Sequence, residues 1–157
     1  MPHIHKFIDF TVGAFIIHKN KVLLVYHKKH KKWLAIGGHI ELNEDPEEAL
    51  YREIKEESGL GKSNITVLAK KQKINDLEIK TIFTPNFVDI HKISITHRHL
   101  EFRYFLKTKG GKIKLAKREH DHIKWFTEVE LSTPKYEVPP GVRFYTKEAL
   151  RLAKTTR

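Results

Sequence analysis

The chain has 157 residues, a length that fits one core, so we predict a single domain over residues 1–157. Hydrophobic residues make up 39% of the chain, which argues against intrinsic disorder. There is no cysteine for disulfides or thiol chemistry and no apolar run of the ~20 residues that span a bilayer, so we expect a cytoplasmic protein without a membrane partner. The net charge of +11 favours an anionic partner, such as a small nucleotide derivative or RNA.

The first elements in chain order predict a β-hairpin followed by a basic loop. Residues 11–26 contain two apolar, β-branched runs of strand length around a turn at 19–21. The run 27–32 (HKKHKK) is expected to form a loop that contacts phosphate or is simply solvated. Trp33 follows this loop and is a candidate substrate-binding residue that stacks on a base; the alternative is a buried anchor at the start of a strand.

The sequence marks a helix over residues 46–58 more clearly than any other element. Asp45 suits the N-cap, Pro46 suits the first helical position, and Glu48 completes a capping box. Gly59 is expected to end the helix, because glycine adopts the positive φ of a helix C-terminus without steric cost.

The rest of the chain predicts an α/β protein with a mixed β-sheet. Strands are expected over 65–73, 87–95, 100–106 and 123–126, and a second helix over 143–154. Strands interleaved with two helices favour a sheet covered by helices.

Three glutamates of the predicted helix stand on one of its faces. Glu53, Glu56 and Glu57 are spaced i, i+3 and i+4, so their carboxylates are neighbours. Like charges this close repel one another unless a cation lies among them, and oxygen ligands suit a hard ion such as Mg²⁺, with Mn²⁺ as a substitute. The alternative is a solvated acidic face whose charge Arg52 or Lys55 partly offsets.

The wider pattern around these glutamates extends from Gly38 to Leu60 and reads GHIELNEDPEEALYREIKEESGL. It contains every fixed position of the Nudix box, so the chain resembles the Nudix hydrolases. The resemblance implies a Nudix-like α/β/α sandwich in which the box forms a loop–helix–loop. It also implies Mg²⁺-dependent hydrolysis of a nucleoside diphosphate linked to another moiety, by attack of water on phosphorus.

The resemblance assigns roles to residues of this box. Glu53, Glu56 and Glu57 match the metal-ligand positions, and the main-chain carbonyl of Gly38 is a common further ligand. Glu53 also serves as the general base or holds it. Divalent ions at such a site neutralise a diphosphate and lower the pKa of bound water, which agrees with this assignment.

Three further residues are expected to take part in catalysis or to support it. Arg52 and Glu44 match positions that orient the glutamate cluster by ion pairing. Many similar sequences carry an acid shortly before the tryptophan of a late strand, near the metal. Glu119 is the candidate for this role, and the alternative is an exposed loop residue; His122 stands where an acid is frequent, which leaves the base open between Glu53 and Glu119.

The strand over 100–106 suggests where substrate binds. His99, Glu101 and Arg103 are predicted to line the substrate cleft, on the sheet face opposite the alternating apolar residues. His97 and His99 form a pair that could ligate zinc, as could a second histidine pair at 120 and 122, but no pattern relates the two pairs to each other.

The substrate itself stays open at this stage. One alternative is hydrolysis at an RNA 5′ end, removing a cap or a terminal diphosphate, which a steep salt dependence would reveal. Another is a non-catalytic domain that senses a nucleotide, although a pure binder does not need the complete glutamate set. A homodimer is compatible with the sequence, but no feature requires one.

Overall fold

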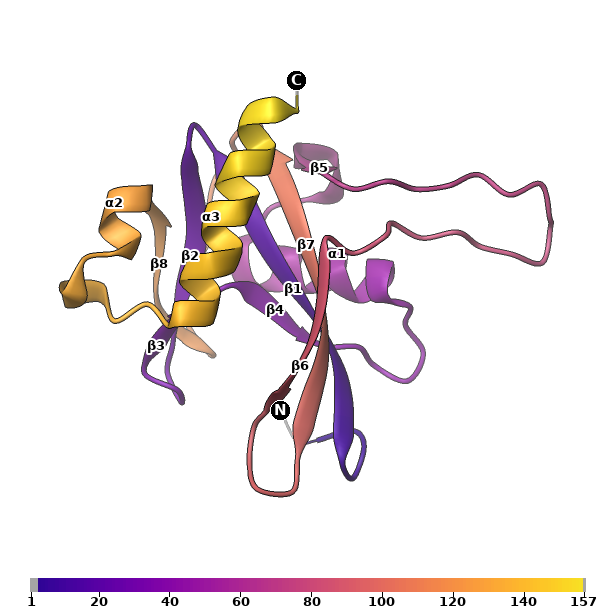
Figure 1. Ribbon diagram of the computed structural model, residues 1–157, viewed down its shortest axis with the longest axis horizontal. Coiled ribbons are helices and arrows are strands. Elements are labelled where there is room, and N and C mark those ends of the chain that lie inside the picture. Colours follow the sequence, from indigo (N-terminus) through magenta and orange to yellow (C-terminus); the bar gives the residue numbers. More distant parts are fainter. Residues whose placement is uncertain (1–2, 157) are drawn as a thin grey trace.

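The computed structural model describes residues 3–156, which form an eight-stranded mixed sheet with helices on both faces (Figure 1). The strands are β1 (Ile8–His18), β2 (Lys21–His27), β3 (Lys32–Leu34), β4 (Ile36–His39), β5 (Ile65–Val67), β6 (Phe87–Lys92), β7 (Arg98–Thr108) and β8 (His120–Phe126). The central strands β1 and β7 run parallel, whereas the other strand pairs are antiparallel. The prediction of a mixed sheet is therefore confirmed.

Two hydrophobic cores lie on opposite faces of this sheet, because successive side chains of a strand point to opposite sides. On β1, Ala14 and Ile16 belong to the core under α1 (Pro46–Ser58), whereas Phe15 and Ile17 belong to the core under α3 (Pro140–Thr155). Figure 1 shows α3 in front of the sheet and α1 behind it. A short helix, α2 (Glu128–Leu131), follows β8. Among residues 3–156, no helix combines the length and apolar character needed to cross a bilayer.

Helix α1 begins and ends where its sequence predicts. The Asp45 side chain accepts hydrogen bonds from the backbone N–H groups of Glu47 and Glu48, and the Glu48 side chain completes the capping box. Gly59 at the C-terminus adopts a φ of 77°, in the left-handed region that favours glycine. These two ends set the register of the box glutamates relative to the sheet.

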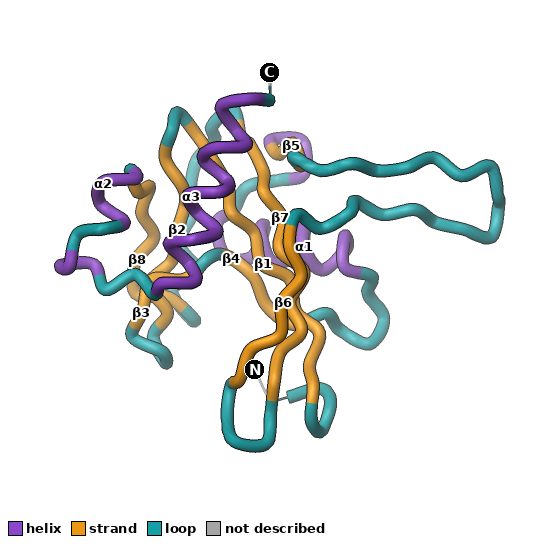
Figure 2. Tube along the Cα trace, viewed as in Figure 1, coloured by secondary structure: helices purple, strands orange, loops and turns teal. Residues whose placement is uncertain are grey.

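Several predicted boundaries differ from the structure. The strand expected over 65–73 ends at Val67, and the lysine-rich residues 70–73 are exposed and enter a long loop that extends away from the sheet (Figure 2). The strand expected over 87–95 ends at Lys92, where the chain turns into β7. The strands expected over 100–106 and 123–126 are longer, at Arg98–Thr108 and His120–Phe126. Helix α3 begins three residues early because proline is tolerated in a first helical turn.

Candidate metal and catalytic site

A cleft of about 320 Å³ opens between strands of the sheet and α1. The predicted site residues on its wall are Gly38, Glu53, Glu57, His99, Glu101, Arg103 and Glu119. These residues come from β4, α1, β7 and the segment before β8, so the fold brings separate parts of the chain together around one space.

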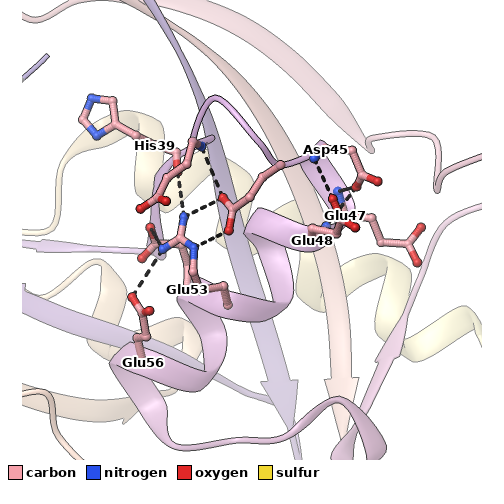
Figure 3. Close-up of polar contacts among 9 residues, drawn as sticks. His39, Asp45, Glu47, Glu48, Glu53 and Glu56 are labelled. Atoms are coloured by element: carbon pink, nitrogen blue, oxygen red, sulfur yellow. Dashed lines mark hydrogen bonds and ion pairs between the residues drawn. The ribbon is translucent and has the colours of Figure 1, made fainter. Parts of the chain in front are cut away.

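Arg52 connects the predicted acidic residues next to this cleft. Two of them, Glu53 and Glu56, are labelled in Figure 3, where dashed lines mark these contacts. Its Nε and Nη2 donate to the two oxygens of Glu44 at 2.6 and 2.9 Å, a bidentate pair. Its Nη1 donates to Glu53 Oε1 at 2.8 Å and to Glu56 Oε2 at 3.3 Å, and Nη2 also reaches the carbonyl oxygen of His39 at 2.9 Å. One guanidinium therefore links three carboxylates and attaches α1 to the end of β4.

Glu53 is buried, with 4% of its surface exposed, and its carboxyl group lies over the backbone of Gly38. A Cβ atom at position 38 would lie 2.6 Å from the Glu53 carboxyl carbon, so only glycine allows this approach. Burial raises the pKa of Glu53 to about 7, although the ion pair with Arg52 opposes this change. A buried carboxylate that lies over the main chain is a suitable environment for a hard cation, because carboxylate and backbone carbonyl oxygens are the ligands such ions prefer.

Glu57 lines the same cleft and is held by two contacts of its own. Its Oε2 accepts a hydrogen bond from the backbone N–H of Gly37 at 3.1 Å, and its Oε1 lies 2.6 Å from Nε2 of His120. Burial raises the pKa of Glu57, while the contacts with His120 lower it. Glu119 joins this group, because one ligand atom from each of Glu57, Glu119 and His120 lies within 4.8 Å of the others.

The three box carboxylates thus form two groups, with Glu53 and Glu56 joined by Arg52 and Glu57 directed toward β8. The Glu56 side chain is 60% exposed. Within residues 3–156, it is not one of the side chains that line the cleft. Carboxylate and carbonyl oxygens predominate in both groups, and this donor set fits Mg²⁺ or Mn²⁺.

Residues 9–147 match the family model for the NUDIX domain. The chain belongs to the Nudix family. A solved structure described as a hydrolase of the NUDIX family from Clostridium perfringens is 34% identical, with a TM-score of 0.76 over 92% of this chain and 97% of that one. The fold and the box predicted from the sequence are therefore those of a Nudix hydrolase.

Two curated Nudix relatives match this chain over shorter regions. The "Probable DHNTP pyrophosphohydrolase" of Lactococcus lactis subsp. cremoris is 29% identical over 114 residues, which are 69% of this chain and 60% of the relative. The "RNA pyrophosphohydrolase" of Halorhodospira halophila is 40% identical over 64 residues, which are 40% of this chain and 35% of the relative. The matched region is thus less than two thirds of either relative's length.

Two of the predicted substrate-binding residues on the Nudix sheet are paired with each other. Arg103 Nη2 lies 2.9 Å from Glu101 Oε2, and its Nε donates to Asp89. Tyr145 also donates to Asp89 Oδ2, at 2.7 Å. Arg103 is therefore a partly neutralised cation, and a substrate phosphate would have to share it with two carboxylates.

Trp33 lies elsewhere, and its prediction as a base-stacking residue is wrong. The residue is 8% exposed and packs at a ring-centroid distance of 4.8 Å from Phe126, in the core on the α3 side. The apolar indole is more stable in this core than in the cleft, so the buried-anchor alternative is correct.

The structure also places histidines in the Nudix site that the box pattern does not indicate. His120 is 1% exposed and faces Glu57, whereas His122 is exposed and lies near Tyr26, so this histidine pair does not act together on one zinc ion. His27, from the basic run, lies 5.4 Å from His120 between ring centroids. No local pattern signals the contact with Glu57, because the two partners are 63 residues apart in the chain.

Proposed function

We propose that this chain is a divalent-metal-dependent pyrophosphohydrolase that cleaves a pyrophosphate bond in a nucleotide derivative. The observation that carries the proposal is the buried Glu53 carboxyl, held by Arg52 above Gly38 on the wall of the cleft. The Nudix family of the chain and the relatives named as pyrophosphohydrolases support the same reaction.

In this proposal Glu53, Glu56 and Glu57, with the carbonyl of Gly38, hold Mg²⁺, for which Mn²⁺ can substitute. The bound ion would neutralise the diphosphate and lower the pKa of a coordinated water. Arg52 restricts the orientation of two of these carboxylates, so little reorganisation is needed when substrate binds.

Proton transfer from the attacking water falls to a carboxylate of the cleft. The pKa of Glu53, raised by burial to about 7, suits a base that works near neutral pH. Glu119 is the second candidate, since it is exposed to the cleft and lies close to Glu57. Expected products are a nucleoside monophosphate and a phosphorylated fragment or pyrophosphate.

A phosphate-release screen tests the proposal. The purified chain would be incubated with Mg²⁺ and a panel of nucleoside triphosphates, nucleotide sugars, dinucleoside polyphosphates, DHNTP and triphosphorylated RNA. We expect turnover of at least one compound and its loss when EDTA is added. Tight binding of one compound, without turnover of any, would instead support the nucleotide-sensing alternative.

A second candidate, hydrolysis at an RNA 5′ end, is favoured by the net charge of +11 and by the relative named as an RNA pyrophosphohydrolase. Lysine and arginine side chains that contact RNA phosphates displace counterions, so affinity for RNA would fall steeply with salt. A triphosphorylated oligonucleotide should then lose affinity between 50 and 200 mM salt by on the order of 10³-fold. A shallow slope would favour a small nucleotide.

Two parts of the proposal concern the chain as a whole. We place it in the cytoplasm, acting on a small-molecule nucleotide derivative, and a homodimer stays a prediction. Cell fractionation and sedimentation of the purified chain would test the location and the oligomeric state.

A further inference from the structure

A second polar cluster lies on the cleft at the N-terminal ends of the two central strands. It consists of His3, Asp9, His39, His97 and His99, and we call it the histidine cluster. The parallel register of β1 and β7 places Asp9 beside His99, and β4 adds His39 at its end. Its residues come from four separate segments of the chain, and only His39, at a variable position, belongs to the box.

Asp9 is the centre of this cluster and is fully buried, with 0% of its surface exposed. Its Oδ1 accepts hydrogen bonds from the backbone N–H groups of Ile4 at 3.1 Å and His5 at 2.6 Å. These two bonds fix the carboxylate plane, and they leave Oδ2 to face the imidazoles. A buried carboxylate that is oriented by backbone donors on one oxygen is typical of a preorganised ligand.

Three imidazole nitrogens converge on that second oxygen. Nδ1 of His3 lies 3.0 Å from Asp9 Oδ2, and Nε2 of His97 and Nε2 of His39 each lie 3.1 Å from it. A carboxylate oxygen has two lone pairs, so it cannot accept three good hydrogen bonds. The contact to His39 indeed lacks hydrogen-bond geometry, and this nitrogen is buried without a hydrogen-bond partner.

A contact at Nδ1 of His97 indicates which nitrogen of this ring carries the proton. Nδ1 of His97 lies 3.3 Å from the carbonyl oxygen of Lys6, and a ring that donates this proton presents a bare lone pair at Nε2. That lone pair faces Asp9 Oδ2, so attraction between the two atoms needs a positive charge, either a proton on Nε2 or a metal ion bound to both. An imidazole that donates its other N–H to a backbone carbonyl is the usual arrangement of a metal-binding histidine.

His99 provides the remaining donor. Its Nε2 is buried and has no hydrogen-bond partner, and its ring centroid lies 5.6 Å from that of His97. Ligand atoms of His3, Asp9, His97 and His99 all lie within 4.8 Å of one another. Ligands around a tetrahedral zinc ion are roughly 3.3 Å apart, given bonds of about 2.0 Å, so small ring rotations would complete the geometry.

We propose that the histidine cluster binds one divalent transition-metal ion, zinc fitting best, through Asp9, His3, His97 and His99. Imidazoles with a single carboxylate suit zinc, whereas Mg²⁺ prefers oxygen ligands alone. His39 is a further donor beside the ion. The ion ties the segment before β1 to the start of β7, independently of the hydrolase function proposed above.

Zinc binding to the untagged, EDTA-treated chain tests the proposal, with a chromogenic chelator as competitor. We expect one zinc ion per chain that a large excess of Mg²⁺ does not displace. His3→Gln and His97→Gln should each weaken zinc binding at least tenfold. The matched control is His5→Gln, because the His5 ring packs on Phe10 and should leave zinc affinity unchanged.

Several results would overturn the site. They are absence of zinc binding, displacement of zinc by Mg²⁺, full affinity in His3→Gln, or loss of affinity in Glu56→Gln, which would assign the zinc to the box glutamates. The His3→Gln variant decides the matter if His97→Gln fails to fold, because the His3 side chain is 47% exposed and its loss leaves the core intact. Co²⁺ provides a second readout, since four-coordinate binding at the cluster gives visible absorption that His3→Gln should remove.

Discussion

The glutamate site and the histidine cluster share one cleft but are built in opposite ways. In the glutamate site a single cation, Arg52, holds three carboxylates, whereas in the histidine cluster a single carboxylate, Asp9, faces three imidazoles. The first donor set suits a hard ion and the second suits zinc. In the two proposals, a single cleft holds two metal chemistries, which are separated by the type of residue gathered around each ion.

We expect the largest effect from a substitution that removes a charge from the glutamate site. Glu53→Gln keeps the shape of the side chain but not its negative charge, so kcat should fall by on the order of 10³-fold. Steady-state kinetics on the substrate found in the screen would measure it. Glu48→Gln is the matched control on the same helix, because glutamine also completes a capping box. Near-normal turnover in Glu53→Gln would contradict the site, and unchanged zinc binding would show that the two sites are independent.

The next effect tests whether one guanidinium really organises the glutamates. Arg52→Lys keeps the charge but cannot form the bidentate pair with Glu44 while reaching Glu53, so kcat/KM should fall roughly 10–100-fold. The control Arg151→Lys changes an exposed pair on α3 and should leave activity unchanged. Equal activity of the two variants would mean that Arg52 acts only through its charge.

The carboxylate of Asp89, next to the histidine cluster, should make the free energy of unfolding depend on pH in the acid range. Burial raises the pKa of Asp89, but hydrogen bonds from Arg103, Tyr145 and His91 outweigh it and lower the pKa to about 2. Because the folded-state pKa lies below the usual aspartate value of 3.8, this stabilisation is present above pH 3.8 and is lost as the pH falls toward 2. Asp89 thereby contributes about 2 kcal/mol to the free energy of unfolding.

Denaturant unfolding between pH 2 and 5 measures this contribution. Asp89→Asn should reduce the dependence of stability on pH in that range, whereas Asp121→Asn, which removes a more exposed carboxylate, should preserve it. A wild-type slope in Asp89→Asn would show that the Asp89 contacts do not stabilise the fold.

The smallest effect concerns the end of α1, which belongs to the glutamate site alone. Gly59→Ala forces a side chain into a φ of 77°, and should lower the free energy of unfolding by about 1 kcal/mol. Gly141→Ala has the opposite expected sign, because position 141 lies in α3 with open space around its Cβ. Thermal unfolding of both variants compares them. Equal destabilisation by the two would show that the positive φ is not the cause.

Local patterns were sufficient for the parts of the molecule whose partners are close in sequence. The cap at Asp45, the stop at Gly59 and the spacing of the box glutamates are decided within one helix, so the sequence predicts α1 at its observed bounds. The prediction of a strand over 65–73 was wrong beyond Val67. Only part of this segment has strand propensity, and its ladder with β7 ends at Val67.

The sequence by itself determined the helix, the Nudix box and the spacing of the three glutamates along α1. Only the tertiary structure decided that Trp33 is buried, that His120 reaches Glu57, and that the histidines of the cluster meet at Asp9. The physical reason is that these contacts join segments tens of residues apart. Their formation depends on strand register and on packing between layers, and neither quantity is contained in the local order of residues.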